Sequence, residues 1–414
     1  MLTKTQQKLL VLSSLGGVLE FYDFIIYALL ASYIAKEFFP TGNNLTTLAA
    51  TFATFSIGYL ARPLGGIVFG HFGDKFGRKQ TFMASILIMA ISTFLIAMVP
   101  AYNVIGVAAP IILTLLRILQ GLSIGGEIPG AIAYVSESIP EKKGFACGII
   151  FCFLISGIVL GSLILAILST FLSEADMLSW GWRIPFILGG IFGIWSYFSR
   201  KQLEESTLFT AIATKTESFP LMRVLQTKLI NTLAATFIVG LGAALIVLLF
   251  LFTPAFVGTI LHYTGKEYIW LRTAGIFLAA VLCIPFGLLA DRFNHKKLIF
   301  ILSIVSMILV YIIFKLYVEN FALAWLALLL SAILVGFTWG VIPALLSELF
   351  PTAIRYSGIA VSYNLGFAIF GGLAPLVATT LIYETKLLVA PFYYIIFTAL
   401  LSIIALLWVR VNWD

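Results

Sequence analysis

Acidic, basic and phenolic side chains interrupt the apolar segments of this 414-residue chain, and these are the side chains most able to bind a ligand or transfer a proton. Glu20, Asp23 and Tyr27 lie at i, i+3 and i+7, a spacing that places them on one face of a helix. Arg62 lies twelve residues before Asp74, or about 18 Å deeper along a straight helix. An ionised group at the centre of a membrane-spanning helix costs about 2.5–3.5 kcal/mol, so each needs a partner or a water-filled cavity. The pattern predicts a polar path through an apolar protein.

A later apolar segment carries both a cation and an acid. Arg117, Gln120 and Glu127 fall within one broad helical face at 100° per residue. A carboxylate in a poorly hydrated cavity favours its protonated form, whereas a nearby guanidinium favours the ionised form, so movement of one helix can load and release a proton. Asp23 and Glu127 are therefore the first candidates for proton coupling, and Glu20 is the third.

Arg62 is the predicted anchor for a substrate, because a buried guanidinium binds a carboxylate through two parallel hydrogen bonds. In the structural alternative, Arg62 pairs with Asp23 or Glu127 and joins helices. The two roles are compatible, since an ion pair that breaks when substrate or a proton arrives is a switch. Aromatic rings in the same cavity would suit an ammonium group by cation–π attraction. The other substrate-binding candidates are Tyr27, Glu20, Gln120, Trp339, Tyr363 and Asn364.

A polar motif occurs twice in the chain, over residues 70–79 and again 217 positions later over residues 287–296. Each copy joins two apolar segments, which is typical of a membrane bundle whose halves repeat in parallel. A second pair of similar segments, 136–140 and 347–351, places an acid before a proline that ends a helix. The loop aspartates can meet helix N-termini and Arg78 can reach an acid such as Glu137, so these contacts would hold the cytoplasmic side closed. The predicted cytoplasmic gate consists of Gly70, Asp74, Gly77, Arg78, Lys79, Glu137, Gly287, Asp291, Arg292, Glu348 and Arg355.

The elements that must position these residues are membrane-spanning helices. Apolar residues make up 61% of the chain and charged residues only 10%, against about 25% charged in soluble proteins. The predicted fold is an all-α integral membrane protein with twelve transmembrane helices in two pseudo-symmetric six-helix bundles, 1–200 and 227–414, joined by a cytoplasmic linker, 201–226. The predicted spans, each near the roughly 20 residues that cross a bilayer, are 9–35, 46–72, 80–100, 104–131, 144–172, 183–200, 227–254, 269–290, 297–317, 321–346, 355–383 and 387–409.

Charge and cysteine usage agree with a multi-pass membrane protein. Lysine and arginine concentrate on one side of the predicted spans, so the positive-inside rule places both termini in the cytoplasm. This topology and attraction to anionic lipid explain the net charge of +7 without a nucleic-acid partner. Glu20 and Asp23 interrupt the first apolar run and no small-residue cleavage site follows, so we interpret it as a retained helix. Cys147, Cys152 and Cys283 lie in apolar helices without a histidine or acidic cluster, and we expect no metal, disulfide or cofactor.

Eight segments in order resemble the metabolite:proton symporter branch of the major facilitator superfamily, which contains proline/betaine, α-ketoglutarate, citrate and shikimate carriers. The resemblance implies alternating access, associates Arg117 in the Arg-x-x-Gln-Gly motif with proton coupling, and implies that the loop motifs lock the outward-open state. The chain departs from the family at Gly16–Gly17, at Phe21 and at Ile128–Pro129–Gly130, which touch expected cavity walls. The resembling segments are residues 19–24, 62–66, 70–79, 117–121, 125–127, 180–186, 203–205 and 350–356.

The predicted function is proton-coupled symport of a small carboxylate-bearing metabolite. A proline- or betaine-like zwitterion is favoured over a dicarboxylate or tricarboxylate, because Arg62 and Arg117 are the obvious deep cations and acids accompany them. A membrane-embedded enzyme is the remote alternative, since the chain has no Gly-x4-Gly-Lys-Ser/Thr loop and no His-Glu-x-x-His motif. A channel fits the parallel repeat less well than a carrier. We expect a monomer in the plasma membrane, a bacterial inner membrane, whose partners are the substrate, protons and the lipid bilayer.

Overall fold

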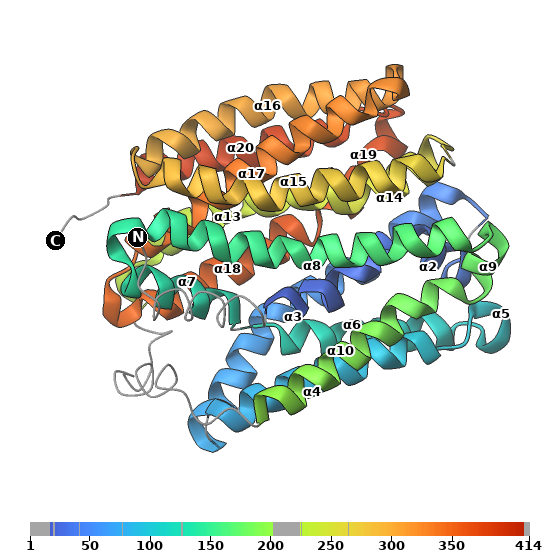
Figure 1. The fold of residues 1–414 in the computed structure, drawn as a ribbon, viewed down its shortest axis with the longest axis horizontal. Coiled ribbons are helices and arrows are strands. Elements are labelled where there is room, and N and C mark those ends of the chain that lie inside the picture. Colours follow the sequence, from blue (N-terminus) through green and yellow to red (C-terminus); the bar gives the residue numbers. More distant parts are fainter. Residues whose placement is uncertain are drawn as a thin grey trace.

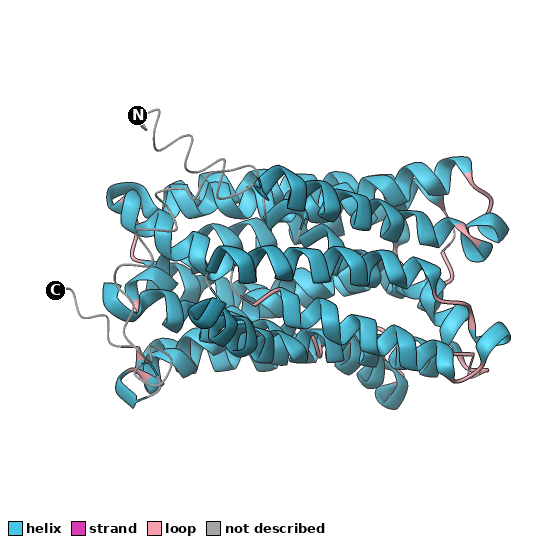
Figure 2. Ribbon diagram, turned by 90° about the horizontal axis from the view of Figure 1, so that it is seen from below, coloured by secondary structure: helices cyan, strands magenta, loops and turns pink. Residues whose placement is uncertain are grey.

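The computed structural model describes residues 17–409, except residues 20, 41, 77, 126, 202–223, 225 and 264. The side chains of residues 69–82, 127, 199–201 and 353 are also outside the description. Within the described part the chain is helical and contains no strand, and the helices run along a common axis with the connecting loops at its two ends (Figure 2). The predicted all-α membrane bundle is confirmed.

The first half begins with a bent pair, Gly17–Leu29 and α2 (Ala31–Phe38), whose axes differ by 57°. The next three long helices are the thirty-three-residue α3 and, after it, α4 and α6, with a short α5 between the last two. A long α8 follows, and a short α9 precedes α10. The bounds are α3 Asn44–Phe76, α4 Arg78–Met98, α5 Tyr102–Ile105, α6 Ala108–Ser123, α7 Glu127–Ser138, α8 Lys143–Phe171, α9 Glu174–Ser179 and α10 Ile184–Lys201.

The second half contains six spans, two of which include π-helical turns. The first runs continuously from Leu229 to Ile260 through α13, η3, α14 and η4, and another joins α18 to α19 through the π-turn η7. Single π-turns in α-helices are frequent at functional sites. The bounds are α13 Leu229–Ile246, η3 Val247–Phe252, α14 Thr253–Ala255, η4 Phe256–Ile260, α15 Lys266–Ala290, α16 His295–Glu319, α17 Ala324–Glu348, α18 Arg355–Gly366, η7 Phe367–Gly371, α19 Ala374–Thr385 and α20 Pro391–Trp408.

Eight of the described spans are long and apolar enough to cross a membrane on their own, and the bent N-terminal pair adds a ninth. The helices α3, α4 and α10 occupy three further predicted spans. The predicted helix over 104–131 differs from the structure, because α6 ends at Ser123 and α7 continues the span to Ser138. Here α3 and α6 touch through their backbones: a Cβ on Gly65 would lie 1.9 Å from the carbonyl oxygen of Leu122. Only glycine permits this approach.

The two halves meet along α8 and α15, which lie side by side in the middle of Figure 1. A Cβ on Gly144 would lie 2.4 Å from the carbonyl oxygen of Gly287, and a Cβ on Gly148 would lie 2.5 Å from that of Cys283. Small residues at these positions let two long helices approach closely inside a membrane protein. This seam between α8 and α15 positions the contacts at both ends of the molecule.

Candidate functional site

Two buried arginines lie in an aromatic cluster near the middle of the bundle. The guanidinium of Arg117 on α6 lies 4.3 Å from the ring centroid of Phe24 and 4.6 Å from that of Tyr27. The guanidinium of Arg62 on α3 lies 5.6 Å from the Phe24 centroid and 5.4 Å from the Tyr59 centroid. Each distance is within cation–π range. Phe24 therefore contacts both cations.

Hydrogen bonds fix Arg117 in place and leave part of its guanidinium unused. Its Nη1 donates to the carbonyl oxygen of Phe24 at 3.2 Å and to Oε1 of Gln120 at 2.8 Å. Nε2 of Gln120 in turn donates to the hydroxyl of Thr93 on α4 at 2.7 Å. Both ends of the Gln120 amide are thus engaged within the protein, so in this conformation Gln120 positions Arg117. Nε and Nη2 of Arg117 have no partner among the described residues.

Asp23 is buried against a different helix. A Cβ on Gly189 of α10 would lie 2.4 Å from Oδ1 of Asp23, and one on Gly193 would lie 3.5 Å from Oδ2. Oδ1 accepts no hydrogen bond from the described part of the chain, and no described cation forms an ion pair with the carboxylate. The pairing of Arg62 with Asp23 that we considered from sequence is therefore absent. An unpaired buried carboxylate is costly when ionised.

Tyr27 faces away from Asp23, although both residues lie on the first helix. Its hydroxyl donates to the carbonyl oxygen of Thr51 on α3 at 3.1 Å, and its ring stacks on Phe55 with centroids 6.3 Å apart. Asp23 instead packs against α10. Glu20, the third member of the predicted polar face, lies outside the described residues, as does the side chain of Glu127.

The candidates of the second half gather around Phe367 in the π-turn η7. Trp339 of α17 stacks on Phe151 at 4.9 Å and on Phe367 at 5.4 Å, and Tyr363 lies 4.7 Å from Phe367. Arg62 of the first half lies 5.4 Å from the same Phe367 ring. Asn364 crosses the interface too, since its Nδ2 donates to the carbonyl oxygen of Gly125 at 2.7 Å, where α6 ends. The structure therefore brings Arg62, Trp339, Tyr363 and Asn364 to the interface of the two halves.

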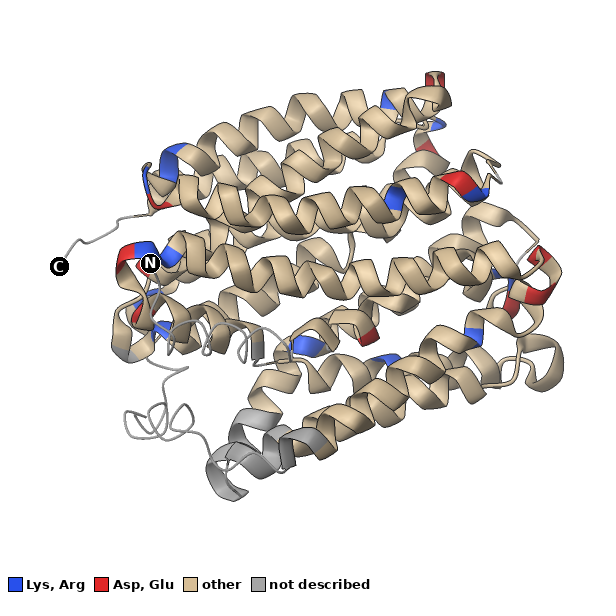
Figure 3. Cartoon of the chain, in the orientation of Figure 1, with Lys and Arg blue, Asp and Glu red and all other residues tan. Residues whose placement is uncertain are grey.

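Charged side chains lie at both ends of the molecule, and at the end on the left in Figure 3 the described cations outnumber the described acids. We call it the basic end. Its described cations are Lys142, Lys143, Lys228, Arg292, Lys296, Lys297 and Arg355, and its described acids are Glu137, Glu141, Asp291 and Glu348. Asp291, directly after α15, accepts hydrogen bonds there from the backbone N–H groups of Gly144 at 2.7 Å and Phe145 at 2.9 Å. These amides belong to the first turn of α8, where unpaired donors and the helix dipole favour an anion. The predicted contact of a loop aspartate with a helix N-terminus is present for Asp291.

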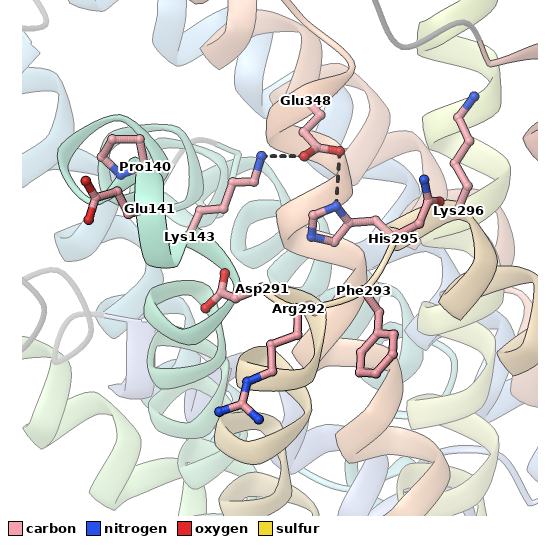
Figure 4. Close-up of a pocket in the computed structure, with 11 residues that line it drawn as sticks. Pro140, Glu141, Lys143, Asp291, Arg292, Phe293, His295, Lys296 and Glu348 are labelled. Atoms are coloured by element: carbon pink, nitrogen blue, oxygen red, sulfur yellow. Dashed lines mark hydrogen bonds and ion pairs between the residues drawn. The ribbon is translucent and has the colours of Figure 1, made fainter. Parts of the chain in front are cut away.

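Two further groups of charged residues join the halves at the basic end. Arg355 of α18 donates through Nη1 to Oε1 of Glu137 on α7 at 2.7 Å. Glu348 of α17 pairs with Lys143 of α8, and its other oxygen lies 3.1 Å from Nδ1 of His295 (Figure 4). Lys143, His295 and Arg292 line a cavity of about 420 Å³ beside these contacts.

Part of the predicted gate falls outside the description. The backbone shows α3 ending at Phe76 and α4 beginning at Arg78, in agreement with a tight connection. Outside the described residues and side chains lie Gly70, Asp74, Gly77, Arg78 and Lys79.

Comparisons with known proteins identify the family. Residues 9–234 match the model described as Sugar (and other) transporter, and residues 232–412 match Major Facilitator Superfamily. The chain belongs to the major facilitator superfamily. It is 34% identical over 399 residues to a putative proline/betaine transporter of Staphylococcus aureus (strain MSSA476), covering 95% of this chain and 85% of the relative. It is 34% identical over 417 residues to the proline/betaine transporter of Escherichia coli (strain K12), covering 96% and 82%. The resemblance stated from the motifs is confirmed.

Solved structures of this superfamily share the fold. The crystal structure of a D-xylose-proton symporter superposes with a TM-score of 0.74 at 16% identity, covering 96% of this chain and 95% of that one. A partially occluded inward-open form of the xylose transporter XylE from Escherichia coli superposes with a TM-score of 0.68 at 17% identity, covering 98% and 97%. At this identity the likeness shows the fold alone.

In this superfamily member the halves also touch at the end opposite the basic end. The hydroxyl of Thr259 in η4 donates to Ser32 of α2 at 3.0 Å. Nε1 of Trp270 on α15 donates to the hydroxyl of Thr170 on α8 at 3.1 Å. Phe52 and Phe252 meet between α3 and η3 with centroids 5.7 Å apart. Contacts between the halves thus exist at both ends at once.

Sequence reasoning missed the rings that surround the two arginines. The missed rings are four of many aromatic residues in apolar helices, and nothing in their spacing distinguishes them from the others: Phe24, Phe55, Tyr59 and Phe367. It also missed Lys143, which the sequence shows only as one of several loop cations. The interruption of α18–α19 by η7 left a weak signal, the glycines at 366, 371 and 372.

Proposed function

We propose that this major facilitator transporter carries a small carboxylate-bearing zwitterion, of the proline or betaine type, together with protons. The observation that carries the proposal is the pair of buried guanidiniums, Arg62 and Arg117, within aromatic rings where the halves meet. No acidic side chain among the described residues forms an ion pair with either. The names of the relatives, proline/betaine transporters over nearly the whole chain, support the same substrate class.

The cluster has the chemistry that a zwitterion needs. A carboxylate can bind the fork of a guanidinium through two charge-assisted hydrogen bonds. Arg62 lies over the rings of Phe24, Tyr59 and Phe367, so the protein's own cation occupies the aromatic surface. A carboxylate that draws Arg62 away frees these rings for the ammonium group of the same ligand. A dicarboxylate would use the cations but not the rings, and is the second candidate.

Asp23 is the proposed proton site. A carboxylate without a cation in an apolar environment is most stable when protonated, and it releases the proton when water or a cation reaches it. The first helix carries both Asp23 and Phe24, so a ligand-driven shift of the rings around Arg62 moves the backbone of Asp23 directly. Glu127 and Glu20 remain further proposed participants.

Alternating access follows from the contacts at the two ends. We place the basic end in the cytoplasm by the positive-inside rule. The proposed cytoplasmic gate then consists of Asp291, Glu348, Glu137, Arg355 and Lys143. The outer side is closed by the contacts of Ser32 and Thr170. Opening one set while the other holds exposes the central cluster to one side at a time.

Uptake into proteoliposomes tests the proposal. Labelled proline, betaine, α-ketoglutarate and citrate are offered with and without an inward proton gradient, and we expect gradient-driven accumulation of proline or betaine. Arg62→Gln should reduce this uptake at least tenfold, whereas Lys315→Gln, which removes an exposed cation paired with Glu319, should not change it. Substrate accumulation that is the same with and without the proton gradient, or normal uptake by Arg62→Gln, would contradict the proposal.

A further inference from the structure

Arg272 is a buried cation that the central cluster does not use. It lies in the second turn of α15, near the end opposite the basic end, and is 1% exposed. The structure encloses it between α8, α15 and α16, and Tyr33 of α2 is also close enough to interact with it electrostatically.

The polar groups around Arg272 are hydroxyls, each of which can donate one hydrogen bond. Nη2 of Arg272 donates to the hydroxyl of Ser162 on α8 at 3.1 Å, and Ser162 lies 2.7 Å from the hydroxyl of Thr273. Nε of Arg272 has no partner among the described residues. The hydroxyls of Tyr268 and Tyr317, which are 5% and 2% exposed, interact with each other, and that of Tyr268 also interacts with Thr253. The rings of these two tyrosines meet edge to face at 6.1 Å.

No described acid neutralises this cation. Glu174, which interacts with the nearby Tyr33, pairs with Lys36 at 3.7 Å, and no described carboxylate lies within ion-pair distance of Arg272. A buried guanidinium without a counter-ion is unfavourable. A guanidinium N–H group without an acceptor, beside hydroxyls that can rotate to donate, matches the needs of an anion.

We propose that Arg272, with Tyr268 and Tyr317, forms an outer binding site for a small anion such as a carboxylate. The hydrogen bond from Arg272 to Ser162 joins the two halves, so the site is closed here and becomes available when α8 and α15 separate at this end. On the proposed function, on which this assignment of ligand rests, the anion is the carboxylate of an incoming substrate, held before it reaches Arg62. A free inorganic anion such as chloride has the same chemistry.

Thermal unfolding of the purified protein in detergent tests the site without relying on transport. Acetate and chloride, each added as the sodium salt, should raise the unfolding midpoint saturably, because a ligand that binds only the folded protein stabilises it. Arg272→Gln should lose this saturable shift, and Arg272→Lys should weaken acetate binding. Lys266→Gln, which removes an exposed cation from the same helix, should keep it. A saturable shift in Arg272→Gln equal to that of the unaltered protein would overturn the proposal.

A second variant covers the case in which Arg272→Gln does not fold. Tyr317→Phe retains the guanidinium and the packing of the ring but removes one donor, and should weaken acetate binding about tenfold or more, the usual effect of one hydrogen bond to a charged group. Unchanged acetate affinity in Tyr317→Phe, or the lack of any saturable shift in the unaltered protein, would also overturn it.

Uptake kinetics distinguish the two sources of the anion. If the substrate's carboxylate uses the site, external chloride should compete with proline and raise its KM, compared with the KM measured in a bulky organic sulfonate as control anion. Arg272→Gln should then raise the KM for proline and abolish the competition by chloride. If a free anion occupies the site, uptake should instead require chloride. Either result supports the site. A protein that binds acetate through Arg272 but transports neither proline nor betaine would contradict the proposed function and leave the anion site standing.

Discussion

Asp291→Asn gives the sharpest test of how the basic end is held closed. Both carboxylate oxygens of Asp291 accept backbone N–H groups from the first turn of α8, at 2.7 and 2.9 Å. Asparagine has nearly the same size but only one acceptor, so one of the two amides would face an NH2 group. The substitution therefore removes one hydrogen bond and the charge that interacts with the helix dipole, while it preserves the packing.

The size of the effect follows from these contacts. A hydrogen bond to a charged group contributes about 1.5–3 kcal/mol, and a charge at a helix N-terminus about 0.3–1 kcal/mol. Asp291 is partly exposed and the asparagine keeps one bond, so we expect a loss of about 1–2 kcal/mol. If the contact is made only in the closed form, the ratio of open to closed basic ends should rise about 5- to 30-fold.

Native cysteines provide the assay. Cys147 and Cys283 are fully buried on the two sides of the seam between α8 and α15, within one or two turns of Asp291 and its partners. Opening of the basic end should expose them, so their alkylation by a maleimide, followed for each cysteine by peptide mass spectrometry, should accelerate by the same 5- to 30-fold. The half-buried Cys152 serves as an internal reference.

Glu141→Gln is the matched control, because it removes one negative charge from the same cavity wall without touching the amides of α8. It should leave alkylation at the rate of the unaltered protein. Equal alkylation of Cys147 and Cys283 in Asp291→Asn and in the control would refute the reasoning.

Two further predictions concern the proton site and the other ion pair. Asp23→Asn should abolish accumulation driven by a proton gradient but retain exchange of internal for external substrate, measured as counterflow, since a neutral amide mimics the protonated acid; loss of both would make Asp23 structural. Arg355→Gln should increase cysteine alkylation less than about 5-fold, because a partly exposed ion pair contributes about 0–1 kcal/mol. Adding Glu137→Gln to it should change nothing more, and additive effects would show that the two residues act separately.

The fold could be predicted from the sequence because it depends on segment properties. Runs of apolar residues near 20 long and the repeat 217 positions apart place the helices and their relation with no knowledge of contacts. The close approach of α6 to Gly65 of α3 could not be predicted, because it is a property of two helices together. The interruption after Ser123 did leave a local signal, since Gly125 and Pro129 both disfavour a continuous helix there.

Some residues of the candidate site could likewise be predicted from the sequence, and others could not. Asp291, Glu137 and Glu348 could be identified because their motifs repeat and lie next to helix ends, where electrostatic partners are limited to a few residues. The depth of Arg62 and Arg117 could also be estimated by counting residues. Their aromatic neighbours could not, since the rotation of each helix about its own axis decides which rings face inward.

The seam between α8 and α15 connects the contacts at the basic end with those at the opposite end. At the basic end an acid of the second half, Asp291, binds amides of α8, and at the other end a cation of the second half, Arg272, binds Ser162 of α8. Both contacts therefore join the same two long helices, of which α15 contains Pro285, a usual site of a bend. When the helices separate at one end while the other end holds, one helix tilts against the other. Gly144 and Gly148 place no side chain between the two helices, so none obstructs this tilt. In the alternating access that we propose, the closed structure, with both contacts made, is the intermediate between the two open forms, and we expect the relative strength of the Asp291 and Arg272 contacts to set which end opens first.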